Sequence, residues 1–235
     1  MNLQLYMASG TRKLLLARHD FYVEQTDKRV LAHFQDIEAE ASRYGEGEFL
    51  RLSSMLDDGT RDEGDVAEAA DYRAQEFYSL LSDLKDQTLL GSLAGLYHQW
   101  EKDLREFIEW ELNHYADRRE VRKVAWGSNL GDVLGLIQDF GWTTRSEPFF
   151  PDVDACRLIV NVYKHGQGHA LNQLAERFPE FVARPFYNWP AAFSTDFLDH
   201  EWLKVTPEQF SRIAGALRAF WTVFPERLLS TGVQV

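Results

Sequence analysis

Apolar residues recur with a period close to 3.6 in nearly every long segment of this 235-residue chain. That period places them along one face of an α-helix, as in amphipathic helices that pack on a core. The alternating strand and helix patterns that are typical of α/β proteins are missing. The pattern therefore predicts an all-α fold, a helical bundle that forms a single domain over residues 1–235, with residues 117–127 as the place for any subdivision.

The first helical pattern runs from residue 9 to about residue 44. A break is predicted near residues 25–27, and Gly45–Gly47 is predicted to end the segment because glycine favours helix ends. Residues 57–65 are acidic and contain two glycines, which predicts a loop.

A second long pattern covers residues 66–115, with Gln87–Thr88 or Gly91 as its predicted break. A shorter helix is expected to start at Ser128 as its N-cap and to end at Gly141. The exposed faces of the pattern over residues 66–115 carry mixed acidic and basic residues, as solvated helix faces do.

The C-terminal third is predicted to contain short elements and one long helix. A short helix should precede Pro179, and an irregular aromatic-rich segment is predicted over residues 184–199. A short strand is expected at Trp202–Val205. The final helix should begin at Thr206, since Thr, Pro and Gln at the first positions are typical of a capping box.

The most apolar predicted helix covers residues 152–165 and is expected to be buried on almost all sides. Four of its polar residues fall at offsets of four, seven and eight, which places them on one stripe: Arg157, Asn161, Lys164 and His165. Polar groups on a core helix need hydrogen-bonding partners, a hydrated cleft or a chemical role. This stripe is therefore the predicted functional centre.

The residue types of this stripe suit a metal-independent ribonuclease. His165 can transfer protons near neutral pH at a ribose hydroxyl, and Asn161 can orient a phosphate or a water. Arg157 and Lys164 can stabilise negative charge on a phosphoryl oxygen. The alternative is a structural polar network in which His165 caps its own helix and Asn161 bonds to neighbouring backbone.

The segment Val160-Asn161-Val-Tyr-Lys-His165 resembles the helix motif of the HEPN superfamily, all-helical domains many of which are RNA-cleaving toxins or defence effectors. The motif's polar position and histidine match Asn161 and His165, whereas its arginine is replaced by Val160, with Arg157 one turn earlier. The wider Asn-x-x-Lys-His-Gly-x-Gly pattern is also similar to that of bacterial helical proteins of unestablished function. The resemblance implies an HEPN-like fold and a homodimer in which two motif helices face one cleft.

A second candidate is the turn after this helix, Lys164-His-Gly-Gln-Gly-His169. Backbone N–H groups of Gly166, Gly168 and His169 are candidate phosphate-binding donors near the start of the next helix. A glycine-rich helix end followed by a new helix explains the same residues without a ligand.

Metal and thiol chemistry find less support. Glu111 and His114 form an i, i+3 pair of the kind that di-iron bundles use, but no second Glu-x-x-His occurs in the sequence. Cys156, the only cysteine, lies in an apolar helix, which favours a small buried residue. We expect no metal and no cofactor.

The composition limits the function classes. With 25 basic and 37 acidic residues, a formal charge of −12 argues against a broad nucleic-acid footprint but allows a local basic cleft. No secretory signal or apolar membrane span is apparent, so a cytoplasmic protein is expected. The sequence thus predicts an RNA-directed nuclease or nucleotide-binding protein, with a catalytically inactive helical interaction protein as the alternative.

Overall fold

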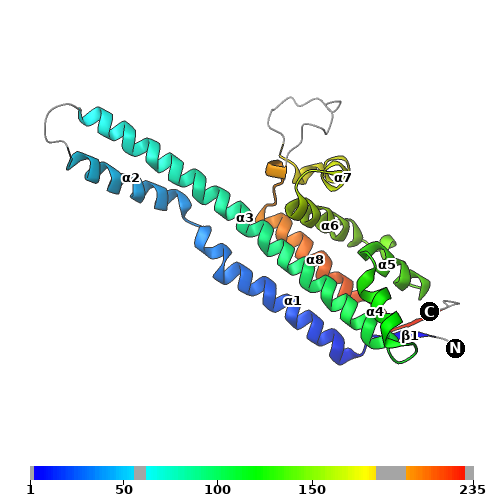
Figure 1. Ribbon diagram of the computed structural model, residues 1–235. Coiled ribbons are helices and arrows are strands. Elements are labelled where there is room, and N and C mark those ends of the chain that lie inside the picture. The colour runs from blue at the N-terminus through cyan, green and yellow to red at the C-terminus, as the bar shows by residue number, and fades with distance from the viewer. Residues whose placement is uncertain (1–2, 56–61, 184–199, 231–235) are drawn as a thin grey trace. The chain divides into compact units, whose positions relative to one another are not determined.

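The computed structural model describes residues 3–55, 62–183 and 200–230, and it confirms the all-α prediction (Figure 1). The α-helices are α1 (Ser9–Arg29), α2 (Ile37–Ser53), α3 (Glu63–Leu112), α4 (Arg118–Gly127), α5 (Leu130–Asp139), α6 (Phe150–His165), α7 (His169–Arg177) and α8 (Pro207–Val223). In the described ranges, the sheet consists of two antiparallel strands that the pattern did not predict, β1 (Gln4–Tyr6) and β2 (Arg227–Leu229). Across the same ranges, no helix is both long and apolar enough to span a membrane.

The chain groups into two compact units. We call residues 1–24 with 90–235 the main unit, and residues 25–89 the small unit.

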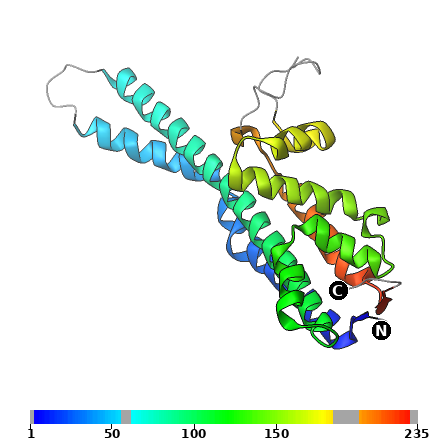
Figure 2. The ribbon, with the colours of Figure 1, turned by 45° about the vertical axis from the view of Figure 1, so that its right-hand side comes forward.

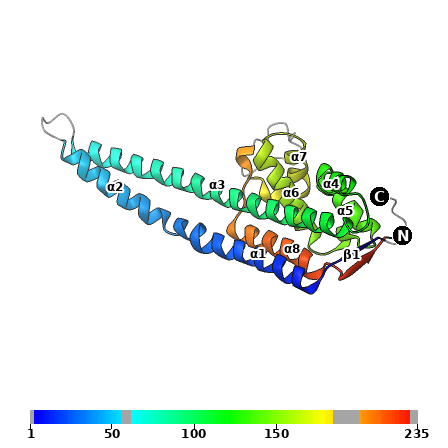
Figure 3. The same ribbon diagram turned by 60° about the horizontal axis from the view of Figure 1, so that its bottom comes forward.

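The main unit is built on an aromatic core at α8, which runs alongside α1 and α3 (Figures 1 and 3). Phe220 meets Trp100 edge to face with ring centroids 5.1 Å apart, and Phe224 meets Phe107 at 5.2 Å. Trp142 packs on Phe224 at 5.0 Å. Burying a large side chain of this kind contributes about 1.5–3 kcal/mol, so this cluster is a major source of stability.

Arg12 and Asp20 of α1 fix α8 in place through polar contacts. The guanidinium of Arg12 donates to the main-chain oxygens of Trp221, Thr222 and Phe224, at 2.6 to 2.9 Å. These carbonyls stand at the end of α8, where main-chain oxygens lack partners within the helix. Asp20 accepts two hydrogen bonds from Arg218 on α8, at 2.7 and 3.0 Å, and this pairing lowers the pKa of Asp20.

Two helix starts test the capping predictions. The predicted capping box of α8 is confirmed: Thr206 Oγ1 accepts from Gln209 N at 3.2 Å, and the Gln209 side chain accepts from Thr206 N at 2.8 Å. The prediction of Ser128 as the N-cap of α5 was wrong by one residue. Asn129 caps α5 in a box with Asp132, because its side-chain oxygen accepts from Asp132 N at 3.1 Å.

In the small unit, α2 packs against the first part of α3. Tyr44 and Phe77 stack with ring centroids 4.4 Å apart, and Glu48 pairs with both Arg51 and Arg73. The prediction that Gly45 ends a helix was wrong, since it lies inside α2. A Cβ atom at Gly45 would lie only 2.8 Å from the Cβ of Ala74, so close helix approach explains this glycine.

The predicted break in the second segment was also wrong, because α3 is continuous through Gln87, Thr88 and Gly91. The side chain of Tyr163 on α6 approaches Gly91, where an added Cβ atom would meet its hydroxyl at 3.3 Å. Sequence alone does not separate a glycine that ends a helix from one that lets a neighbour approach.

Several other predictions concern segments between helices. The predicted loop at 57–65 lies partly outside the described residues, but Glu63 already begins α3, where Asp62 Oδ1 accepts from the main chain of Gly64 and Asp65. The strand expected at Trp202–Val205 is reduced to one bridge between Val182 and Leu203. The irregular segment predicted for 184–199 lies outside the described residues.

We expect Gly45→Ala to lower the free energy of unfolding by about 1–3 kcal/mol, because overpacking forces two backbones apart. The matched control is Gly47→Ala in the same helix, where an added Cβ meets nothing within 4 Å. That change should instead raise the free energy of unfolding by roughly 0.5–1 kcal/mol through helix propensity. Urea unfolding followed by circular dichroism measures both, and a shift of the same sign in the two variants would contradict the packing role of Gly45.

We also expect Asn129→Ala to cost about 1 kcal/mol of stability, because the backbone N–H of Asp132 at the start of α5 loses its side-chain acceptor. Ser128→Ala should change the free energy of unfolding by less than about 0.5 kcal/mol, as surface substitutions usually do. Thermal melts of the two variants distinguish the observed cap from the predicted one, and equal losses would refute the assignment.

Candidate functional site

A cleft of about 670 Å³ lies in the main unit along one face of α6. Its size falls in the usual range of small-molecule pockets, about 300–1,000 Å³. Residues of α3, α5, α6, α7 and the segment before α6 line it: Tyr97, His98, Glu101, Arg105, Asn129, Leu130, Gly131, Leu134, Arg145, Phe150, Val153, Asp154, Arg157, Val160, Asn161, Lys164 and Arg177.

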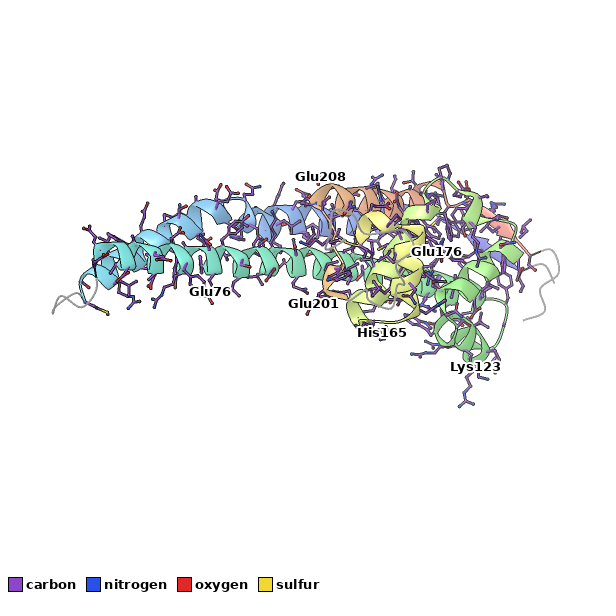
Figure 4. The ribbon with its side chains drawn as sticks, turned by 90° about the horizontal axis from the view of Figure 1, so that it is seen from above. Glu76, Lys123, His165, Glu176, Glu201 and Glu208 are labelled. Atoms are coloured by element: carbon purple, nitrogen blue, oxygen red, sulfur yellow. The ribbon has the colours of Figure 1, made fainter. Side chains whose placement is uncertain are left out.

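Three of the four residues predicted as catalytic lie in this cleft: Arg157, Asn161 and Lys164. They are four and seven positions apart, so a rotation of about 100° per residue brings them to one side of α6. His165 follows Lys164 directly and therefore turns about 100° further round the helix. It is exposed at the end of α6 and is not among the cleft-lining residues of the described chain (Figure 4).

Asp154 is buried on α6, three residues before Arg157, and its carboxylate forms ion pairs with two arginines. Its Oδ1 accepts from Arg157 Nε at 2.9 Å and from Arg157 Nη2 at 2.7 Å. Its Oδ2 forms an ion pair with Arg177 of α7. The side chain of Asp154 is 9% exposed, against 32% for Arg157 and 45% for Arg177, so one buried carboxylate holds two half-hydrated cations at the cleft.

Arg105 of α3 also lines the cleft, and its hydrogen bonds stabilise the fold. Its Nη1 donates to the main-chain oxygens of Ala125 and Ser128, at 2.6 and 3.0 Å, near the end of α4. Its Nε and Nη2 donate to Glu101. Because four of its five N–H donors are committed and the residue is buried, Arg105 positions the α4–α5 connection and contributes mainly charge to the cleft.

Other polar groups of the cleft are free to bind a ligand. Within the described part of the chain, Arg145, Asn161 and Lys164 have neither a hydrogen-bonding partner nor an ion pair through their side chains. Counting every lysine, arginine and carboxylate that lines the cleft gives five cations and two anions, a formal charge of +3. This surplus stands out in a chain whose formal charge is −12, and it favours an anionic occupant.

The remaining wall is apolar or aromatic. Val160, at the position of the HEPN motif arginine, is buried and brings neither charge nor hydrogen-bonding capacity. Tyr97 is also buried, and desolvation followed by the nearby Glu101 raises the pKa of its phenol, so it stays neutral. Next to it, His98 is exposed and offers an aromatic face at the cleft.

The turn predicted to bind phosphate does not line the cleft. Gly166 has a φ of +73°, and its N–H donates to the Val162 oxygen at 2.8 Å, which ends α6. Gly168 has a φ of +139° and stands as N-cap of α7, which His169 begins. The glycines therefore form the helix-to-helix connection that was the alternative explanation, and Gly166 has its N–H committed to it.

The metal and thiol candidates have structural roles. The carboxylate of Glu111 accepts from Tyr6 N on β1 at 2.9 Å, and His114 Nδ1 lies 3.2 Å from the Glu111 main-chain oxygen. Cys156 is fully buried, and desolvation raises the pKa of its thiol. No group of three or more His, Cys, Asp or Glu side chains suited to a metal occurs among the residues that the structure describes.

The sequence analysis missed three of the five cations at this site, Arg105, Arg145 and Arg177. Arg145 lies in a 3-10 helix (Thr144–Ser146) and Arg177 at the end of α7, and neither belongs to a pattern with Arg157. Only the packing of α7 against α6 brings Arg177 to Asp154 (Figure 2). An i, i+3 pairing of Asp154 with Arg157 was the one signal in the sequence.

Comparisons with protein-family models, with curated proteins and with solved structures find no match to this chain.

Asp154→Asn should lower the free energy of unfolding by about 1–3 kcal/mol, the usual loss for hydrogen bonds to charged groups. The two arginines are partly hydrated, which keeps the cost below that of a fully buried charge. Asp139→Asn, at an exposed position of α5, is the matched control and should change stability by less than about 0.5 kcal/mol. Chemical denaturation measures the difference, and two equal values would show that the Asp154 network does not stabilise the fold.

Proposed function

We propose that this protein binds a phosphate-bearing ligand, a nucleotide or a short RNA segment, in the α6 cleft. The observation that carries the proposal is the set of free polar groups there, Arg145, Asn161 and Lys164, within a cleft of formal charge +3. Guanidinium and ammonium groups are the side chains that proteins most often use for phosphate, and an amide adds directional hydrogen bonds.

The arrangement suits a ligand with both an anionic and an aromatic part. Arg145 and Lys164 can bind phosphoryl oxygens, while Asp154 keeps Arg157 and Arg177 near the same space. The ring of His98 can stack on a base, an interaction worth roughly 1–3 kcal/mol per base. The mixture of these groups favours a nucleotide over a free inorganic anion.

Binding has more support than RNA cleavage. The residue proposed for proton transfer, His165, is outside the cleft-lining set, and Val160 replaces the arginine of the HEPN motif. A general acid or base must lie within hydrogen-bonding reach of the proton that it moves. The proposal is thus a nucleotide-binding, HEPN-like protein whose stripe recognises phosphate.

The test is a titration of the protein with ATP and with a fluorescein-labelled single-stranded RNA of twelve nucleotides, at two salt concentrations. Lys164→Gln and Arg145→Gln should each weaken binding about tenfold, because loss of a charged hydrogen bond costs on the order of 1.4 kcal/mol. Wild-type affinity should fall with added salt, as expected for phosphate contacts.

Matched controls are available on the same unit. Lys102→Gln and Arg118→Gln remove exposed cations that do not line the cleft and should leave affinity within about twofold. His165→Ala should likewise retain binding. Equal losses in the Lys102 and Lys164 variants would reduce the effect to net charge and overturn the proposed site, whereas RNA cleavage that disappears in His165→Ala would restore the nuclease hypothesis.

A further inference from the structure

An open groove of about 1,020 Å³ lies within the small unit, between α2 and the first part of α3. Its floor consists of small or apolar residues from both helices: Ala41, Gly45, Phe49, Leu50, Ala67, Ala70, Ala74 and Tyr78. Leu50 is 69% exposed and Tyr78 is 39% exposed, so large apolar side chains face solvent at the rim. Exposed apolar surface of this extent, bordered by polar residues, is typical of a protein-binding surface.

The groove follows from the way in which α2 and α3 pack. Gly45 and Ala74 let the two helices approach closely, and the Tyr44–Phe77 stack fills the space beside that approach. On the groove side the facing positions are mainly alanine and glycine, whose side chains are too short to fill the space between two helix surfaces. A third helix, placed over the groove, would complete this packing in the way that helical bundles do.

The negative charge around the groove favours a basic binding partner. Three carboxylates line it, Glu38, Glu46 and Asp71, and none of its described lining residues is lysine, arginine or histidine. The small unit as a whole, residues 25–89, has sixteen acidic and seven basic residues, a formal charge of −9. A basic partner gains from this field, while a second copy of the same acidic unit and an anionic membrane are both repelled by it.

The length of the groove sets the length of the partner. Its lining runs from Glu38 to Leu50 on α2 and from Ala67 to Tyr78 on α3. At about 1.5 Å per residue, twelve helical residues span roughly 18 Å, which matches about three turns of a docked helix. Such helices bind with apolar side chains at positions i, i+3, i+4 and i+7 in the groove.

We propose that the α2–α3 groove binds an amphipathic helix of a partner protein, about three turns long, whose apolar face is flanked by lysine or arginine. Apolar side chains of that helix occupy the alanine-lined floor next to Leu50 and Tyr78. Its basic flanks pair with Glu38, Glu46 and Asp71. This interaction is independent of the phosphate-binding function proposed for the cleft.

The test uses a fluorescein-labelled fourteen-residue peptide of leucine and lysine, with leucine on one helical face, titrated with the full-length protein. A peptide of the same composition, reordered so that leucine does not form one face, and a leucine–glutamate analogue are the probe controls. The amphipathic basic peptide should bind at least tenfold more tightly than either control, and added salt should weaken it.

Two pairs of variants locate the site. Leu50→Glu and Glu46→Lys alter the groove and should each reduce affinity at least tenfold. Leu80→Glu and Glu76→Lys are matched changes at exposed positions of α3 outside the groove and should change affinity less than twofold; Figure 4 labels Glu76. Circular dichroism should show all four folded, since each position is exposed.

Two outcomes would overturn the proposal. One is binding of the amphipathic peptide that is no tighter than that of the reordered peptide, or that is unaffected by Leu50→Glu. The other is a dimer in light scattering that Leu50→Glu dissociates, since the groove would then be a contact between two copies of this chain.

Discussion

The burial of α6 is the constraint on which the main unit depends. Half of its sixteen residues are buried, because α7 and α8 pack against it. The side of α6 that carries Arg157, Asn161 and Lys164 borders the cleft. Asp154 is the one charged group among its buried residues, and its bonds to Arg157 and Arg177 satisfy a carboxylate that would be costly to bury alone.

The cleft is positively charged in an acidic protein because five cations from separate elements line it against two carboxylates. Arg105 is committed to the end of α4 and to Glu101, and two further arginines share a single aspartate. These contacts hold Arg105, Arg157 and Arg177 in place. Arg145 and Lys164 add two more positive charges, and their side chains have no partner in the described chain. Preorganised cations of this kind bind an anion with little loss of side-chain entropy.

Charge is unevenly divided along the chain. The small unit has a formal charge of −9 of the total −12, which leaves −3 for residues 1–24 and 90–235 together. The electrostatics of the two candidate binding surfaces are therefore opposite, a basic cleft in the main unit and an acidic apolar groove in the small unit. Such opposition favours different partners for the two surfaces and disfavours exchange of ligands between them.

The sequence by itself determined the all-α class, the capped start of α8 and the buried state of Cys156, and it placed Arg157, Asn161 and Lys164 on one side of α6. These are local properties, since a 3.6-residue period or a capping box is complete within a few turns of chain. The role of Gly45 and Gly91 depended on tertiary structure, because a glycine that ends a helix and one that admits a neighbour look alike in sequence. The composition of the cleft was likewise a tertiary result: Arg145 and Arg177 reach it from separate elements, and one residue of helical rotation leaves His165 outside it.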